Sequence, residues 1–484
     1  MPVSNRLKNQ HLLWRAAFGP MAENVAELDK ISPKELWALL SKTSGQKPPS
    51  INVATNMMDG LVKGIDDLVQ LEKLSKEQKK TIRQQSRQDL KNLNLRWLDE
   101  MIESAAQFRE KMSLFWHGHF ACRVINIYFQ QQLLDIVRTN ALGKFGDLLR
   151  EVSKSPAMLQ FLNNQQNRKQ RPNENFAREV MELFTMGRGN YSEHDIKEAA
   201  RAFTGWGFNL KGDFVFRRFQ HDDDEKIFLG KKGNFDGDDI INRLLEQKQT
   251  ATFITRKIYR YFVNENMDEA KVKWLSDRFY QSEYDIKKLM EDIFTSDWFY
   301  EEKNIGTRIK SPVELLVGIR RLLPLELQNE RSQLLLQHAL GQVLFYPPNV
   351  AGWPGGKSWI DSSTLMLRLR IPKLIAASET IDISPKNDDD VTMGQMMDSK
   401  MNENADRQAA AKAGGSTVNW QIVSKIFEEV PKENLLATVA ATLLQTRGSA
   451  CVAIANKYLD SSGRENYIRT AIIRLMSTPE YQLC

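Results

Sequence analysis

Cysteine is scarce in this chain, which holds only Cys122, Cys451 and Cys484, with no C-x-x-C pair. That scarcity argues against a disulfide framework and against a cysteine-based zinc site. The chain also lacks any apolar run near the roughly 20 residues that a bilayer span needs, so no membrane span is expected. The N-terminal segment has no uninterrupted apolar stretch followed by a small-residue cleavage site. We therefore expect a cytoplasmic protein as written, and a periplasmic one only if a leader was removed or the protein is exported with a partner.

The chain also lacks a large excess of positive or negative charge. The 67 Lys and Arg residues nearly balance 61 Asp and Glu residues, for a net charge of +6, and the basic pairs are scattered beside acids. A nucleic-acid-binding protein normally shows a concentrated basic face, so no nucleic acid is expected. The segment 232–243 lacks the acidic ends of a calcium-binding loop, and Gly356-Lys357-Ser358 lacks the first glycine and the strand of a phosphate-binding loop.

Helical periodicity dominates what is present. Residues 84–116 contain neither proline nor glycine and place apolar residues three and four apart, which predicts one long amphipathic helix ending near Gly118. The best strand signal is the alternating run at 213–219, which predicts a small hairpin. We expect a mainly α fold: a multi-helix globular body with at most a small β-hairpin and a C-terminal helical unit.

Composition divides the chain into three parts. Residues 1–380 form the expected main helical body, which contains the candidate site. Residues 381–418 hold an aspartate run and Gly414-Gly415-Ser416 but almost no large apolar side chains, so they predict a linker or insertion. Residues 419–484 predict a small helical unit that packs on the body.

The Trp116-His117-Gly118-His119-Phe120 segment is the first candidate site, because two of only six histidines lie two residues apart. Inside a regular helix the two imidazoles point about 200° apart, so both reach one ion only if the helix ends at Gly118. The aromatic neighbours would supply a dry shell around a metal. The competing interpretation is that both histidines satisfy polar groups at a buried helix end.

Carboxylates on a second predicted helix, 173–186, complete this candidate site. Asn175, Glu179 and Glu182 share one flank of the helix, and Glu179 lies closest to its apolar edge. A carboxylate at the border of a core is suited to metal binding or to proton transfer. Arg178 would position an anionic group, or it would simply pair with a glutamate one turn away.

His221 and Asp222, on a loop after the predicted hairpin, would add an imidazole and a carboxylate. A mixed nitrogen and oxygen site of this kind suits zinc, iron or manganese. The alternative is a solvated acidic turn. A rigid, aromatic-rich loop at 346–356 is typical of a pocket wall. The expected pocket-lining residues are Asn175, Trp116, Trp206, Asn349 and Trp353.

These segments together resemble a large bacterial family of unknown function, the one numbered 1800. The matching stretches are His11–Arg15 with Phe18-Gly19, Lys111–Phe120, Pro172–Gly187, Glu198–Trp206, Phe228–Gly230 with Phe235–Gly237, Ser311–Gly318, and Tyr346–Gly356 with Trp359-Ile360. The resemblance implies no reaction. It does imply that the histidine and glutamate segments belong to the family's core pattern. Members often look exported and commonly neighbour genes of proteins similar to alkaline phosphatases and sulfatases.

Two functional hypotheses follow. The first is a metal-dependent enzyme, hydrolytic before oxidative, in which His117, His119, Glu179, His221 and Asp222 hold a divalent ion. Glu182 and Arg178 would be its catalytic residues. The second is a non-catalytic helical scaffold or accessory protein for a phosphatase- or sulfatase-like partner. The sequence alone leaves open whether the chain is an enzyme.

Overall fold

The computed structural model describes residues 3–54, 75–209, 211–376, 416–446 and 449–484. Helices make up most of this part of the chain, and its strands form three short antiparallel pairs. The mainly helical fold that the hydrophobic periodicity predicts is confirmed.

The first half of the described chain contributes the helices around the His-Gly-His segment. They are α1 (Asn5–Ala16), α2 (Pro33–Thr43), α4 (Lys76–Glu103), α5 (Gln107–His119), α6 (Ile127–Asn140), α7 (Phe145–Lys154), α8 (Pro156–Phe161), α9 (Glu174–Glu179) and α10 (Glu193–Ala202). Ser32, Ser75 and Ser192 begin α2, α4 and α10 with capping boxes, in which the serine and the third helical residue bond each other's backbone N–H. A π-helix, Val180–Thr185, continues directly from α9.

The second half follows the same pattern. Its helices are α11 (Gly237–Leu245), α12 (Lys248–Phe262), α13 (Glu269–Gln281), α14 (Ile286–Phe294), α15 (Pro312–Leu322), α16 (Ser332–Leu340), α17 (Ser362–Ala376), α20 (Trp420–Lys425), α21 (Leu435–Leu443), α22 (Ser449–Asn456) and α23 (Arg464–Met476). Short 3-10 turns, such as Ala22–Asp29 and Gly356–Trp359, link several of them.

The strands are peripheral. The expected hairpin exists as β1 (Trp206–Phe208) paired with β2 (Phe214–Phe216), in the register Gly207 to Val215. The structure adds a second hairpin, β3 (Lys226–Phe228) with β4 (Lys231–Gly233), and a long-range pair, β5 (Leu325–Leu327) with β6 (Ser416–Val418). Each strand has three residues, so none of these pairs forms a layer of its own.

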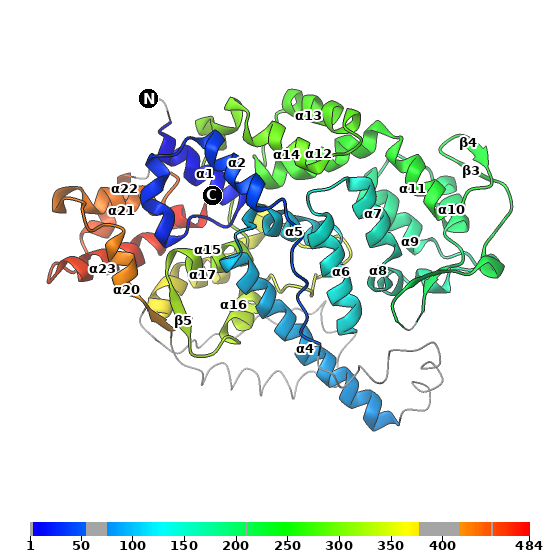
Figure 1. Ribbon diagram of the computed structural model, residues 1–484, viewed down its shortest axis with the longest axis horizontal. Coiled ribbons are helices and arrows are strands. Elements are labelled where there is room, and N and C mark those ends of the chain that lie inside the picture. Colours follow the sequence, from blue (N-terminus) through cyan, green and yellow to red (C-terminus); the bar gives the residue numbers. More distant parts are fainter. Residues whose placement is uncertain (1–2, 55–74, 210, 377–415, 447–448) are drawn as a thin grey trace.

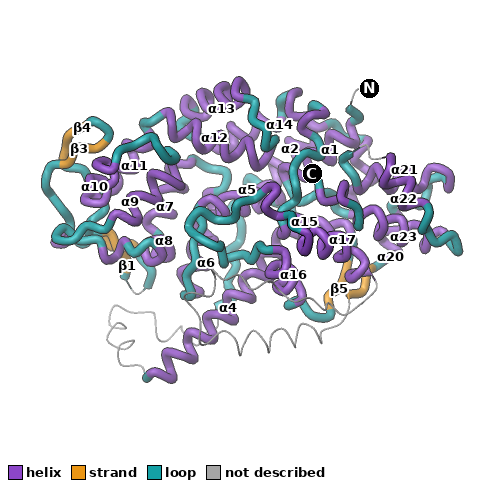
Figure 2. Tube along the Cα trace, turned by 180° about the vertical axis from the view of Figure 1, so that it is seen from behind, coloured by secondary structure: helices purple, strands orange, loops and turns teal. Residues whose placement is uncertain are grey.

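The apolar core is divided between large clusters of buried side chains. One cluster runs through the helices from α1 to α14. Another joins α15, α16 and α17 to α20–α23. Helices α20–α23 form one end of the molecule (Figure 1). Seen from behind, the chain's C-terminal end again lies beside α1 (Figure 2), so distant parts of the sequence meet at that point.

One long helix over 84–116 was the wrong expectation. The structure divides it into α4 and α5, because residues Ser104 to Ala106 leave the helical path. The side-chain amide of Gln107 donates to the carbonyls of Met101 (3.0 Å) and Ser104 (2.7 Å), which satisfies the end of α4. No proline or glycine marks this break, so periodicity could not reveal it.

The expected linker at 381–418 lies outside the described residues except for 416–418, which form β6. Within the described part, no helix combines the length and the apolar character that a membrane crossing requires.

Candidate functional site

Helix α5 continues through the His-Gly-His segment and ends at His119, where the N–H of Phe120 donates to the carbonyl of Trp116 at 2.8 Å. The expectation that the helix stops at Gly118 was therefore wrong. Gly118 adopts a helical conformation, and another segment of the chain packs against its carbonyl. Gly352, at φ +78°, approaches the Gly118 carbonyl so closely that a side chain there would collide with it.

His117 points toward the loop that follows α16. Its Nε2 accepts a hydrogen bond from the N–H of Phe345 at 3.2 Å. Its ring packs against Trp97, Phe345 and Trp353, with centroids 5.1, 5.1 and 5.6 Å away. Burial lowers the pKa of His117 to about 3, so the imidazole is neutral in the folded protein.

His119 points instead toward the π-helix and α12. Its Nε2 lies 3.2 Å from the carbonyl of Phe184, and its Nδ1 lies 3.1 Å from the amine nitrogen of Lys257. A carbonyl only accepts, so Nε2 carries the proton and Nδ1 is the acceptor. Burial first, and the Lys257 charge second, lower the pKa of His119 well below its ordinary value.

Glu182 and Arg178, on the π-helix and α9, are engaged with their own neighbours. Glu182 accepts a hydrogen bond from the hydroxyl of Tyr191 at 3.0 Å. Arg178 pairs with Glu193 at 2.8 Å and with Glu174 at 3.2 Å. For Glu179, partial burial and the Glu182 charge raise the pKa. Neither histidine contributes to that shift.

His221 and Asp222 lie beside α10. The Nδ1 of His221 is 3.0 Å from the Thr204 carbonyl. Asp222 accepts two hydrogen bonds from Arg201, at 2.7 and 3.1 Å. Burial alone would raise the pKa of Asp222. The hydrogen bonds and charge of Arg201, the Asp224 N–H and the charge of Lys226 together outweigh burial, so the pKa is lowered. The carbonyl of Asp222 also accepts from the amine of Lys226, at the start of the second hairpin.

The expected pocket-lining residues do not share one pocket. Trp353 does lie beside His117. Trp116 and Trp206 are core residues, and the Trp116 indole donates to a backbone carbonyl at 3.1 Å. Asn175 donates to the Leu162 carbonyl at 3.2 Å, and Asn349 is an exposed turn residue that accepts from the Ala351 N–H.

The predicted ligand residues therefore lie in separate surroundings. His117 faces a loop and His119 faces the π-helix. His221 and Asp222 lie beside α10, in contact with Thr204 and Arg201, and no histidine acts on the pKa of Glu179. Among the described residues, no three or more His, Cys, Asp or Glu side chains are grouped closely enough to hold a metal ion.

Sequence reasoning missed Lys257, on α12. Its amine lies 3.1 Å from His119 Nδ1 and 3.2 Å from the carbonyl of Leu183. Leu183 and Phe184 both belong to the π-helix, whose widened turn presents successive carbonyls to these side chains. The π-helix thus brings the imidazole and the amine together.

Lys257 also lacks a counterion. In the described part of the chain its amine makes hydrogen bonds with the histidine and a carbonyl, and the charge acting on it is the repulsive one of Arg260. Burial, and then Arg260, lower the pKa of Lys257 to about 8. A lysine with a depressed pKa and no carboxylate partner is typical of a functional site.

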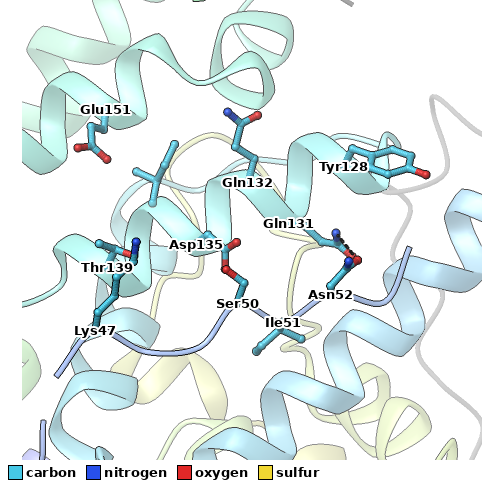
Figure 3. Close-up of a pocket in the computed structure, with 11 residues that line it drawn as sticks. Lys47, Ser50, Ile51, Asn52, Tyr128, Gln131, Gln132, Asp135, Thr139 and Glu151 are labelled. Atoms are coloured by element: carbon cyan, nitrogen blue, oxygen red, sulfur yellow. Dashed lines mark hydrogen bonds between the residues drawn. The ribbon is translucent and has the colours of Figure 1, made fainter. Parts of the chain in front are cut away.

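The surface is hollowed elsewhere, across α6 and α7. One hollow of about 560 Å³ is lined by Asp135, Gln131 and Glu151, and Figure 3 shows the hydrogen bond from Gln131 to Asn52 at one end of it. A second hollow, of about 300 Å³, adjoins it and shares Glu151. Neither hollow contains any of the residues predicted for the site, nor Lys257.

Comparison with known proteins leaves the geometry as the main guide to function. No curated protein matches the chain, and neither does any solved structure. The model of a family described as "Protein of unknown function (DUF1800)" matches residues 11–483. Because the match covers nearly the entire chain, the resemblance is confirmed, and the protein belongs to the DUF1800 family.

Proposed function

We propose that the chain is an enzyme in which the amine of Lys257 is the nucleophile and His119 positions it. One observation supports this most: an amine without a counterion is hydrogen-bonded to a neutral imidazole, 3.1 Å from its Nδ1. Lysines activated in this way form covalent adducts with carbonyl compounds. The reaction class is covalent addition of the amine to a carbonyl compound. The substrate would therefore carry an electrophilic carbonyl carbon.

The hydrogen-bond geometry prepares the amine for attack. A neutral amine has two N–H bonds, and here two acceptors, His119 Nδ1 and the Leu183 carbonyl, are in place to receive them. The remaining tetrahedral position holds the lone pair, which points away from both acceptors. With a pKa of about 8, a sizeable fraction of the amine is neutral near neutral pH.

The amine of Lys257 would react with a carbonyl carbon to form an imine. The lone pair forms an N–C bond, and the carbonyl π electrons move to oxygen. The nitrogen becomes positively charged, and His119 Nδ1 already accepts a hydrogen bond from one of its protons. Transfer of a proton to the oxygen and loss of water leave an imine on Lys257.

Reductive trapping tests this proposal. The purified protein is incubated with glyoxylate and sodium cyanoborohydride at pH 7.5, digested, and mapped by mass spectrometry. We expect the adduct on the peptide that carries Lys257, at a rate well above that of an exposed lysine such as Lys273. Lys257→Arg keeps the positive charge and the donors but removes the nucleophile, so it is the matched control. Equal labelling of Lys257 and Lys273, or none on Lys257, would contradict the proposal.

The metal-dependent enzyme and the accessory protein, the two hypotheses from the sequence, remain predictions, and each is tested by a different measurement. A metal-dependent enzyme predicts a stoichiometric zinc, iron or manganese ion that is lost in a folded His117→Ala/His119→Ala variant. An accessory protein for a phosphatase- or sulfatase-like partner predicts that Lys257→Arg leaves every measurable property unchanged. Metal analysis and the trapping experiment therefore separate all three.

A further inference from the structure

Buried cations gather where α1, α5, α15 and α17 meet, apart from the Lys257 centre. At the middle lies Glu314, which forms ion pairs with Lys111 and Arg308. Three further buried cations, Arg15, Lys310 and Arg368, surround this group. Glu314 and the negative charge at Cys484 are the principal anions acting on it. Positive charge is therefore in excess within a fully buried region.

The excess positive charge coincides with missing hydrogen bonds. In the described part of the chain, Nε and one terminal nitrogen of Arg15 have no partner, nor does Nε of Arg308, and two nitrogens of Arg368 are also unpartnered. Buried guanidinium N–H groups are nearly always satisfied, and an unpaired buried charge costs several kcal/mol. Burial lowers the pKa of Arg15 to about 10, which reflects this cost.

Arg15 and Arg308 are neighbours. The other end of Arg15 donates to the carbonyl of Asn304 at 3.1 Å, four residues before Arg308. The central carbon of the Arg308 guanidinium lies 4.6 Å from the ring centroid of Tyr261. The positive charge of Arg308 lowers the pKa of Arg15, so the two guanidinium groups lie within electrostatic range of each other.

We propose that a small oxyanion, of the phosphate, sulfate or carboxylate class, binds between Arg15 and Arg308. Planar guanidinium groups bind such oxygens with paired N–H donors. This inference is independent of the proposed function, because it involves neither His119 nor Lys257.

The position of this site suggests what the anion does. Arg308 exchanges two backbone hydrogen bonds with Cys484, at 2.7 and 3.0 Å, while Arg15 lies on α1. Gln10, also on α1, donates to the carbonyls of Ala441 and Thr442 on α21. A bound anion would therefore fasten α1 to the region where the end of the chain packs, and would stabilise that junction.

Thermal unfolding of the full chain tests the proposal. Sodium phosphate, sulfate and acetate are compared with chloride at equal ionic strength and at 0 to about 10 mM anion, below the range of general salt effects. Stabilisation should follow the logarithm of anion concentration. A rise in the unfolding midpoint with phosphate or sulfate alone identifies the ligand as a tetrahedral oxyanion. A rise with acetate alone identifies it as a carboxylate. If all four salts give the same midpoint, the proposal is wrong.

Variants at Arg15 test whether the anion-dependent stabilisation arises at the proposed site. Arg15→Gln should abolish the anion-dependent shift, and Arg15→Lys, which keeps the charge but loses the paired donors, should weaken binding about tenfold. Arg278→Gln is the matched control, because Arg278 is an exposed arginine paired with Asp292. A shift that persists in folded Arg15→Lys at full strength would overturn the assignment to Arg15. If Arg15→Gln does not fold, Arg15→Lys and the wild-type salt series still decide.

Discussion

Two buried polar centres in this protein differ in one respect, which is whether the buried cation is paired with a carboxylate. At the first, Glu110 accepts from the Trp97 indole at 2.9 Å and from Arg138 at 2.7 and 3.1 Å, while Arg138 also donates to Pro49 and Glu100. At the second, the amine of Lys257 meets two acceptors and no counterion. A centre whose cation has a counterion, here called complete, stabilises the fold. A centre without one, here called incomplete, retains a group that can react.

Breaking the complete centre should have the largest effect. Glu110→Gln leaves the buried Arg138 without its main counterion, and loss of one partner of a buried pair typically costs about 3–5 kcal/mol. Urea denaturation measures the free energy of unfolding. Arg278→Gln, at an exposed pair, should change it by no more than about 0.5 kcal/mol. A loss below about 1 kcal/mol in Glu110→Gln would show that the network does not stabilise the fold.

Acidification should produce the next effect, through His117. Its folded-state pKa of about 3 lies below the ordinary 6.5, so protonation favours the unfolded state. The stability that the neutral ring contributes is complete above pH 6.5 and is lost as the pH falls toward 3. At pH 5 the loss is about 2 kcal/mol.

The matched variants for this prediction are His117→Gln and His194→Gln, the second at an exposed histidine. Denaturation at pH 7.5 and pH 5 should show a smaller decrease for His117→Gln than for the wild type. His194→Gln should behave as the wild type does. Parallel decreases in all three proteins would mean that His117 is protonated without cost.

The incomplete centre should tolerate change. Lys257→Met removes an amine whose burial is not offset by a carboxylate, so we expect the free energy of unfolding to change by no more than about 1 kcal/mol. The glyoxylate adduct should disappear at the same time. A loss of about 3 kcal/mol or more, as expected for Glu110→Gln, would place Lys257 among the structural residues.

The smallest effect should come from Gly118→Ala. A side chain at Gly118 would meet no atom within 4 Å, and the residue is helical. Alanine favours helix over glycine by roughly 0.5–1 kcal/mol, and the effect is smaller in a terminal turn. Thermal unfolding should show a small rise with trapping at Lys257 unchanged. Marked destabilisation would indicate that Gly118 has a conformational role that its backbone angles do not show.

The fold was predictable to a large extent, because periodic apolar residues report which face of each helix is buried. The close packing of Gly352 against the carbonyl of Gly118 was not predictable, because the two residues are more than 200 positions apart. The same limit hid Lys257. Its helix carries other lysines and arginines at 248–260, and only the tertiary position of His119 and the π-helix distinguishes it.

The site residues predicted from the sequence illustrate the same limit. Spacing placed His117 and His119 together correctly along the chain, but it could not show that a continuous helix turns their rings apart. Wheel position put Glu179 at the border of the core, where burial does raise its pKa. It could not reveal that its neighbour Glu182 is bonded to Tyr191.

The rate at which Lys257 reacts with acetic anhydride across pH tests the central claim most directly. Competitive labelling with mass spectrometry gives the titration midpoint of each lysine in one experiment, with exposed Lys273 as an internal reference. We expect a midpoint for Lys257 near 8, which the pKa of its amine sets, and a reactivity at pH 8 above that of Lys273. A midpoint near 10.5, or no reaction at any pH where the protein is folded, would contradict it.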